Sequence, residues 1–231
     1  MNEQLFNRRF LLAAGASVPL LSLSACASMG GGFSLVEAIR RLLTLSSQRA
    51  FAALLQPGGF YDHSLARIAL PAQFAGGGSL ISQVLGSAPV RERLARSLNS
   101  VAERGAERAA PIITDAITSI SIADAVSIVR GVSGPAAATA LLEQQLGGGL
   151  VSAMFPAVGD ALRLTQNDIV GQALRVVSGY DIAGLARDVT DGANRGIWRA
   201  ISAEESAIRA NPQATNDPLL IAVFGLGGAG R

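Results

Sequence analysis

The sequence predicts an all-α protein, an irregular bundle of about seven to nine helices that follows a cleaved signal peptide. Three observations support this fold class. Apolar residues recur at steps of three and four through most of the chain after Phe33, which is the period of an amphipathic helix. Proline and glycine clusters interrupt that period and set helix ends. Aromatic residues make up only 5% of the chain, and its abundant alanine suits helices packed at close range.

Residues 1–25 have the pattern of a cleaved export signal. Arg8 and Arg9 precede a nearly continuous apolar segment from Phe10 to Leu23. This segment of about 14 residues is shorter than the roughly 20 that a membrane-spanning helix needs, so it is predicted to be removed. The arginine pair is similar to a twin-arginine export motif. An ordinary secretory signal also carries such a pair, and both export routes stay open.

A lipid attachment site follows the apolar segment. Leu23-Ser24-Ala25-Cys26 is similar to the lipobox of bacterial lipoproteins, which implies cleavage between Ala25 and Cys26 and acylation at Cys26. Proteins held by two or three acyl chains stay bound to a membrane. We therefore expect a lipoprotein, carrying palmitate-type chains, on the periplasmic side of the bacterial envelope. Ala27 after the cysteine favours the outer membrane.

The predicted organisation has four parts. A signal peptide at 1–25 is followed by a lipidated tether at 26–32, a helical domain at 33–225 and a flexible tail at 226–231. The tether reaches at most about 20 Å when extended, which keeps the helical domain close to the membrane. The glycines at 147–149 mark a candidate division of the helical domain into two subdomains.

The composition excludes several kinds of site. All 19 basic residues are arginine, which rules out a lysine Schiff base and a P-loop. Cys26 is the only cysteine and His63 the only histidine, so we predict no metal site, no cofactor and no catalytic residue of those types. His63 is interpreted as a surface or structural residue. A formal net charge of +2 is small for a nucleic-acid-binding protein, so no nucleic-acid partner is expected.

Local start and stop signals divide the helical domain. Ser34 and Glu37 form a capping box at the start of the first helix, and Pro57 follows its end. Pro89 and Pro111 each suit a first helical turn, so a separate helix is expected after each. The nine main helices are expected at residues 34–55, 89–110, 112–119, 121–131, 134–146, 150–164, 165–177, 182–201 and 202–210, with two short helices at 79–85 and 217–224.

Two stretches of the helical domain carry a family pattern. The first contains Gly59, Phe60, Arg67, Ile68, Leu70 and Pro71, and the second contains Glu204, Glu205, Ile208, Arg209 and Pro212. By these residues the chain resembles domain-of-unknown-function family 4197, a bacterial family of mostly exported proteins, over about residues 33–225. Typical members have Tyr-Phe-Arg where this chain has Ala140-Leu141-Leu142. The resemblance implies no known activity.

Two hypotheses for function remain. The first is a non-enzymatic envelope lipoprotein that binds another envelope protein, or an apolar ligand between its helices. The second is a periplasmic hydrolase that uses carboxylates, with Asp115, Asp124, Glu204 and Arg209 as candidate site residues. Convergence of these four side chains on one pocket would favour the hydrolase. If they are instead dispersed and singly paired, the binding protein is favoured.

Overall fold

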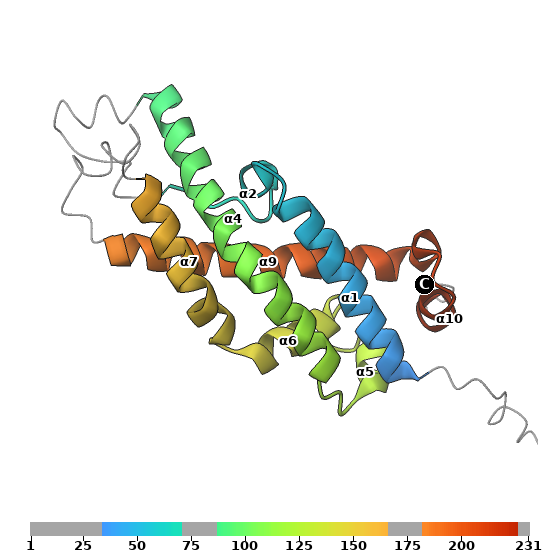
Figure 1. Ribbon diagram of the computed structural model, residues 1–231. Coiled ribbons are helices and arrows are strands. Elements are labelled where there is room, and N and C mark those ends of the chain that lie inside the picture. Colours follow the sequence, from blue (N-terminus) through green and yellow to red (C-terminus); the bar gives the residue numbers. More distant parts are fainter. Residues whose placement is uncertain (1–33, 71–86, 166–181, 226–231) are drawn as a thin grey trace, which may run out of the picture. The chain divides into compact units, whose positions relative to one another are not determined.

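The computed structural model confirms an all-α fold, and its described residues are 34–70, 87–165 and 182–225 (Figure 1). Among them there are helices and no strand. The elements are α1 (Leu35–Leu54), α2 (Gly59–Asp62), α4 (Ala88–Ser119), α5 (Ala125–Arg130), α6 (Ala137–Leu146), α7 (Gly149–Thr165), α9 (Ile182–Ala210), a 3-10 helix (Pro212–Thr215) and α10 (Pro218–Phe224). No helix in these ranges is long and apolar enough to cross a membrane.

Some predicted features fall on residues that the structure does not describe. These are the export motif with Arg8 and Arg9, the cleavage and lipidation site at Ala25 and Cys26, the tether, the helix at 79–85, all but the first residue of the helix at 165–177, and the tail. They stay predictions from the sequence.

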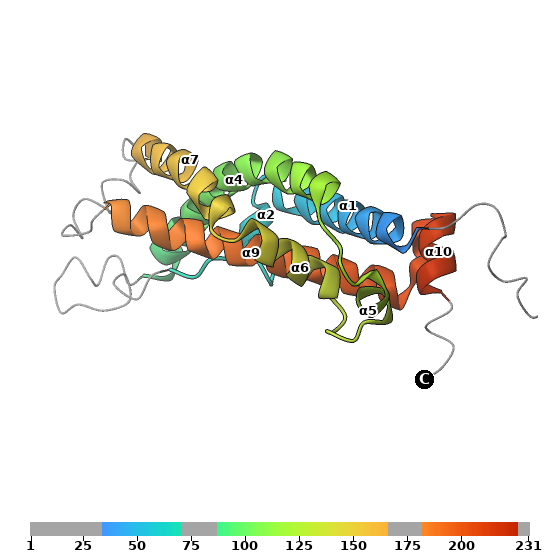
Figure 2. The ribbon, with the colours of Figure 1, turned by 90° about the horizontal axis from the view of Figure 1, so that it is seen from below.

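Helices α1, α4 and α7 form one layer, and α9 crosses all three on the other side (Figures 1 and 2). The shorter α5, α6 and α10 pack around the ends of these long helices. One buried hydrophobic cluster joins the long helices, and residues on both sides of 147–149 contribute to it. Leu42 of α1, Ile113 of α4, Met154 of α7 and Ile197 of α9 are fully buried members of this cluster.

The first helix begins where the sequence predicts. The Ser34 hydroxyl accepts a hydrogen bond from the Glu37 amide at 3.3 Å, which is one half of the predicted capping box. The other half is different, because the Glu37 carboxylate pairs with Arg41 at 3.0 Å instead of reaching back to Ser34. The helix ends at Leu54, shortly before Pro57.

The prediction of a helix boundary at Pro111 is wrong. Residues 88–119 form the single helix α4, with Pro111 inside it. Proline removes one backbone hydrogen bond and strains the preceding turn, which costs about 3 kcal/mol. The side chain of Pro111 is on the exposed face, while Ala109, Ile113 and Ile117 continue the buried face across it. Burying Ile113 and Ile117 contributes about 1.5–3 kcal/mol each, enough to offset the proline.

Two further boundaries also differ from the prediction. Residues 202–205, expected to start a new helix, lie inside α9, which runs without a break to Ala210. Helix α5 begins after Asp124 rather than at Ser121, because the Asp124 carboxylate accepts a hydrogen bond from the Ser127 amide at 2.9 Å. The start at Asp217 is as predicted, since its carboxylate accepts from the first amides of α10.

Candidate functional site

The four candidate site residues do not share a pocket in the described part of the chain. Asp115 is exposed on α4, and Asp124 is the exposed N-cap of α5. Glu204 lies on α9 and pairs with Arg49 of α1 at 3.9 Å. Arg209, one turn further along α9, has a side chain only 11% exposed. None of the four lines either of the two pockets described below.

Arg209 instead belongs to a buried hydrogen-bond network around Glu205. The Glu205 carboxylate is fully buried and accepts from Arg209 Nε at 2.8 Å. It also accepts from the backbone amides of Ala138 and Thr139, at 3.2 and 2.7 Å, and from the Thr139 hydroxyl at 2.6 Å. These amides lie at the N-terminal turn of α6, where a negative charge is favourable. Glu205 of α9 therefore caps α6.

Arg209 connects this network to two more elements. Its Nη1 donates to the Val129 carbonyl at 3.2 Å, and its guanidinium lies 4.8 Å from the centre of the Phe224 ring. A glutamate followed four residues later by an arginine on a helix is typical of an ion pair, and Glu205 and Arg209 have this spacing. Its burial could not be predicted, because α6 and α10 are distant in the sequence. This network holds α5, α6, α9 and α10 together, which is a structural role.

A first pocket, the α1–α4 groove, lies between those two helices and has a volume of about 370 Å³. Its lining includes Ser47, Phe51 and Ala52 of α1, the C-cap residue Leu55 and Ile117 of α4, and no charged residue lines it. Leu55 is 37% exposed, which is high for a leucine beside a core. Ser47 is only 4% exposed, and its hydroxyl oxygen has no hydrogen-bond partner among the described residues.

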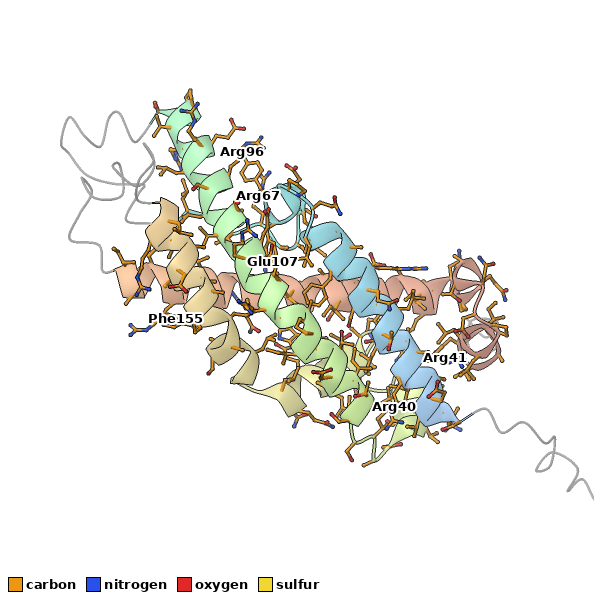
Figure 3. The ribbon with its side chains drawn as sticks, viewed as in Figure 1. Arg40, Arg41, Arg67, Arg96, Glu107 and Phe155 are labelled. Carbon is orange, nitrogen blue, oxygen red and sulfur yellow. The ribbon has the colours of Figure 1, made fainter. Side chains whose placement is uncertain are left out.

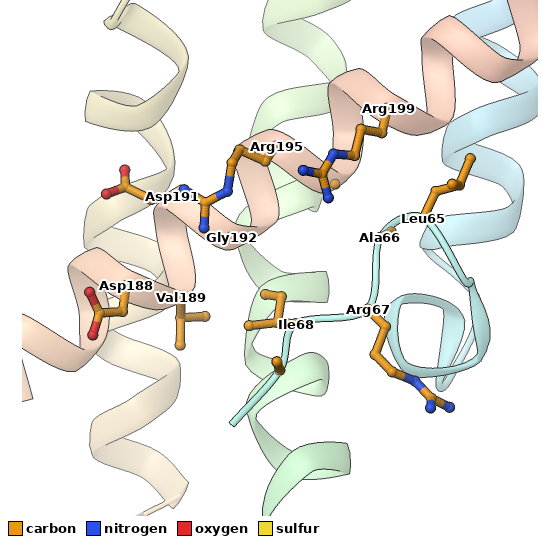
Figure 4. Close-up of a pocket in the computed structure, with 12 residues that line it drawn as sticks. Leu65, Ala66, Arg67, Ile68, Asp188, Val189, Asp191, Gly192, Arg195 and Arg199 are labelled. Carbon is orange, nitrogen blue, oxygen red and sulfur yellow. The ribbon is translucent and has the colours of Figure 1, made fainter. Parts of the chain in front are cut away.

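A second pocket, the α9 pocket, lies between α9 and segment 65–69, which begins in a turn, and has a volume of about 280 Å³ (Figure 4). Its lining includes Ala66 and Ile68 of the segment and Asp188, Asp191, Gly192, Arg195, Gly196 and Arg199 of α9. The segment carries the Arg67-Ile68 pair of the family pattern. No pattern along the chain indicates either pocket, since each depends on how distant segments pack.

Two glycines let segment 65–69 lie directly against α9. A Cβ atom on Gly196 would lie 3.0 Å from the Ala66 carbonyl oxygen, and one on Gly192 would lie 3.2 Å from the Ile68 side chain. From the other side, the fully buried Asn99 of α4 accepts from the Ile68 amide at 2.8 Å and donates to the Ile68 carbonyl at 2.9 Å. The segment is thus fixed on both sides.

Arg67 does not point into the α9 pocket. Its side chain points away from α9 in Figure 4, donates to the Tyr61 carbonyl and stacks at 4.0 Å on the Tyr61 ring. Arg96 of α4 stacks on the same ring at 4.3 Å, and both arginines lie beside α2 in Figure 3. His63 follows α2 as its C-cap, and its Nδ1 is buried without a partner among the described residues. This segment of the family pattern is therefore held by packing contacts.

The described residues contain no group of three or more histidine, cysteine, aspartate or glutamate side chains able to hold a metal ion. Trp198 of α9 is 4% exposed, within the core, and its indole nitrogen donates to Asn194 at 3.1 Å. Trp198 is thus a core residue.

Comparison with known proteins covers nearly all of the helical domain. The model of a family described as "Protein of unknown function (DUF4197)" matches residues 32–225. A search of curated proteins and a search of solved structures each gave no match. The matched span contains every described helix and both pockets. The chain therefore belongs to the DUF4197 family of proteins of unknown function.

Proposed function

We propose that this chain is a lipid-anchored protein of the bacterial envelope that binds a neutral, mainly apolar ligand in the α1–α4 groove. The observation that carries the proposal is the uncharged lining of that groove around the unpartnered hydroxyl of Ser47. Ligand pockets in proteins are mostly apolar, with a few placed polar groups, and commonly measure about 300–1,000 Å³. The groove agrees with this description.

The chemistry of the lining defines the ligand class. A charged ligand would lose its hydration in the groove without gaining an opposite charge, which is unfavourable. Phe51, Leu55 and Ile117 offer apolar contact, and Leu55 remains partly exposed for a ligand to cover. The unpartnered Ser47 hydroxyl oxygen is buried behind this lining, and the uncharged polar residues Thr44, Gln48, Gln56 and Thr114 also line the groove. A neutral amphipathic molecule fits these features.

The same observations argue against the hydrolase. Carboxylate-dependent hydrolysis needs acid and base groups on one substrate, and no carboxylate lines the α1–α4 groove. Asp115 is exposed on α4, and Asp124 caps α5. Glu204 pairs with Arg49, and Arg209 pairs with Glu205. This dispersal favours a binding protein.

The membrane part of the proposal depends on Cys26. The lipobox-like sequence Leu23-Ser24-Ala25-Cys26 supports it, and metabolic labelling with a palmitate analogue tests it. Labelled protein in the membrane fraction, with no label in Cys26→Ser, is the expected result. Equal labelling of both forms, or an unlabelled wild type that stays soluble, would remove the anchor from the proposal.

The groove can be tested by filling it at an exposed position. Ala52 and its neighbour Ala53 are both exposed on α1, but only Ala52 lines the groove. The neutral fluorescent probe N-phenyl-1-naphthylamine would be titrated into the wild type, Ala52→Trp and Ala53→Trp. We expect Ala52→Trp to weaken binding about tenfold or more and Ala53→Trp to leave it within about twofold, where tenfold corresponds to about 1.4 kcal/mol.

The matched pair of variants makes the test decisive. Circular dichroism would show that both variants keep the helical content of the wild type. No saturable binding by the wild type, or equal binding by both tryptophan variants, would place the ligand elsewhere and refute the groove as the site.

A further inference from the structure

We propose that the α9 pocket binds a phosphate group through Arg195 and Arg199. This site is separate from the α1–α4 groove, because neither arginine lines the groove. The two arginines lie one turn apart on α9, and both line the α9 pocket. In Figure 4 both side chains lean back along α9, and the Arg195 guanidinium lies beside Asp191 and Gly192.

Arg195 and Arg199 are arginines without a protein partner in the described part of the chain. Neither makes a hydrogen bond or an ion pair there, whereas Arg41 pairs with Glu37, and Arg104 with Glu107. Arg195 and Arg199 are both exposed and lie four residues apart on the helix, so their like charges repel each other, while Asp191, four residues before Arg195, offsets part of that repulsion. A bound anion would relieve the repulsion that remains.

The opposite wall of the pocket is fixed, so the two guanidinium groups face a defined surface. Asn99 holds the Ile68 backbone by two hydrogen bonds, and Gly196 lets the Ala66 backbone approach α9 closely. A side chain at position 196 would push this wall away. The pocket volume of about 280 Å³ is large enough for a phosphate group.

The arrangement favours phosphate over carboxylate. A carboxylate is planar, and one guanidinium group can satisfy both of its oxygens in a bidentate pair. A phosphate group is tetrahedral and offers three or more acceptor oxygens, so it can bind two guanidinium groups at once. Asp188 and Asp191 also line the pocket, further toward the start of α9. Their negative charge confines the phosphate to the end of the pocket near Arg199.

Isothermal titration with inorganic phosphate tests the site in the wild type, the double variant Arg195→Gln/Arg199→Gln, and Arg187→Gln. Arg187 is the matched control, because it is exposed on the same helix and does not line the pocket. Glutamine is a good helix former, so the variants are expected to keep the wild-type circular dichroism. We expect the double variant to bind phosphate at least about tenfold more weakly and Arg187→Gln to stay within about twofold.

A second measurement identifies where the phosphate group comes from. Sedimentation with vesicles that contain or lack phosphatidylglycerol would be compared for the same three proteins, each also carrying Cys26→Ser so that the proposed lipid anchor does not itself bind the vesicles. Loss of vesicle binding only in the double variant supports a lipid headgroup as the ligand, and unchanged vesicle binding supports soluble phosphate. The proposal is overturned if the wild type does not bind inorganic phosphate, or if the double variant and Arg187→Gln lose the same affinity.

Discussion

Removing the buried carboxylate of Glu205 should destabilise the protein far more than removing its exposed neighbour. Glu205→Ala deletes an ion pair with Arg209 at 2.8 Å and the acceptor for two amides and one hydroxyl of α6. It also leaves the Arg209 guanidinium, only 11% exposed, without its counter-charge. Breaking a buried pair by removing one partner typically costs about 3–5 kcal/mol. We expect a loss of that size in the free energy of unfolding.

Glu204→Ala is the matched control for this prediction. Glu204 is the adjacent residue of the same type, its side chain is 36% exposed, and its pair with Arg49 is long at 3.9 Å. Exposed ion pairs contribute about 0–1 kcal/mol. Urea denaturation followed by circular dichroism would compare the two variants with the wild type. A loss for Glu205→Ala within about 1 kcal/mol of that for Glu204→Ala would show that the network does not hold the helices together as argued.

Two further predictions concern α4. Asn99→Leu removes both hydrogen bonds to Ile68 in a fully buried position. It should lower the free energy of unfolding by about 2–4 kcal/mol in the same assay, because buried unsatisfied groups cost about 1–3 kcal/mol each. An unchanged urea midpoint would contradict the role given to Asn99. For Glu103, burial raises the pKa of the carboxyl above its ordinary 4.5, although amides at the start of α2 lower it. Its contribution to stability is therefore full below pH 4.5 and is lost as pH rises through the raised pKa. We expect Glu103→Gln to be more stable than the wild type at neutral pH and equal to it in acid, and the reverse order would contradict this assignment.

Much of the fold could be predicted because its signals are local. The cap at Ser34, the break at Pro57 and the start at Asp217 each depend on side chains within a few residues. The predicted helix boundary at Pro111 is wrong even though proline is a typical helix-start residue. At Pro111, burial of Ile113 and Ile117 continues the helix across a residue that would otherwise begin a new one. Tertiary packing decides between a proline that starts a helix and one that is tolerated inside it.

Glu205 shows the same limit in another form. A glutamate after Ser202 predicts the first turn of a helix, because carboxylates favour helix N-termini. In the structure Glu205 does occupy a helix N-terminus, but the helix is α6 and Glu205 itself lies inside α9. The residue type correctly indicates the interaction. Its partner, 66 residues away in the sequence, is set by the packing of α6 on α9.

The candidate sites could not be predicted for a related reason. The α1–α4 groove depends on the crossing of two helices, and the α9 pocket depends on the approach of segment 65–69 to Gly196. Neither groove nor pocket leaves a pattern of spacing along the chain. The weak candidates Asp115 and Asp124 were chosen by residue type, and their surroundings are local caps and exposed surface.

The residues by which the chain resembles its family have mainly structural partners in this fold. Phe60 and Ile208 are buried in the core, Ile68 is fixed by Asn99, and Glu205 and Arg209 form the network under α6 and α10. Packing and hydrogen bonding account for these residue types, so they need no activity to explain them. An activity has to be sought among groups that packing does not explain. Within the described residues, the unpartnered Ser47 hydroxyl beside an uncharged groove and the arginine pair of α9 meet that condition.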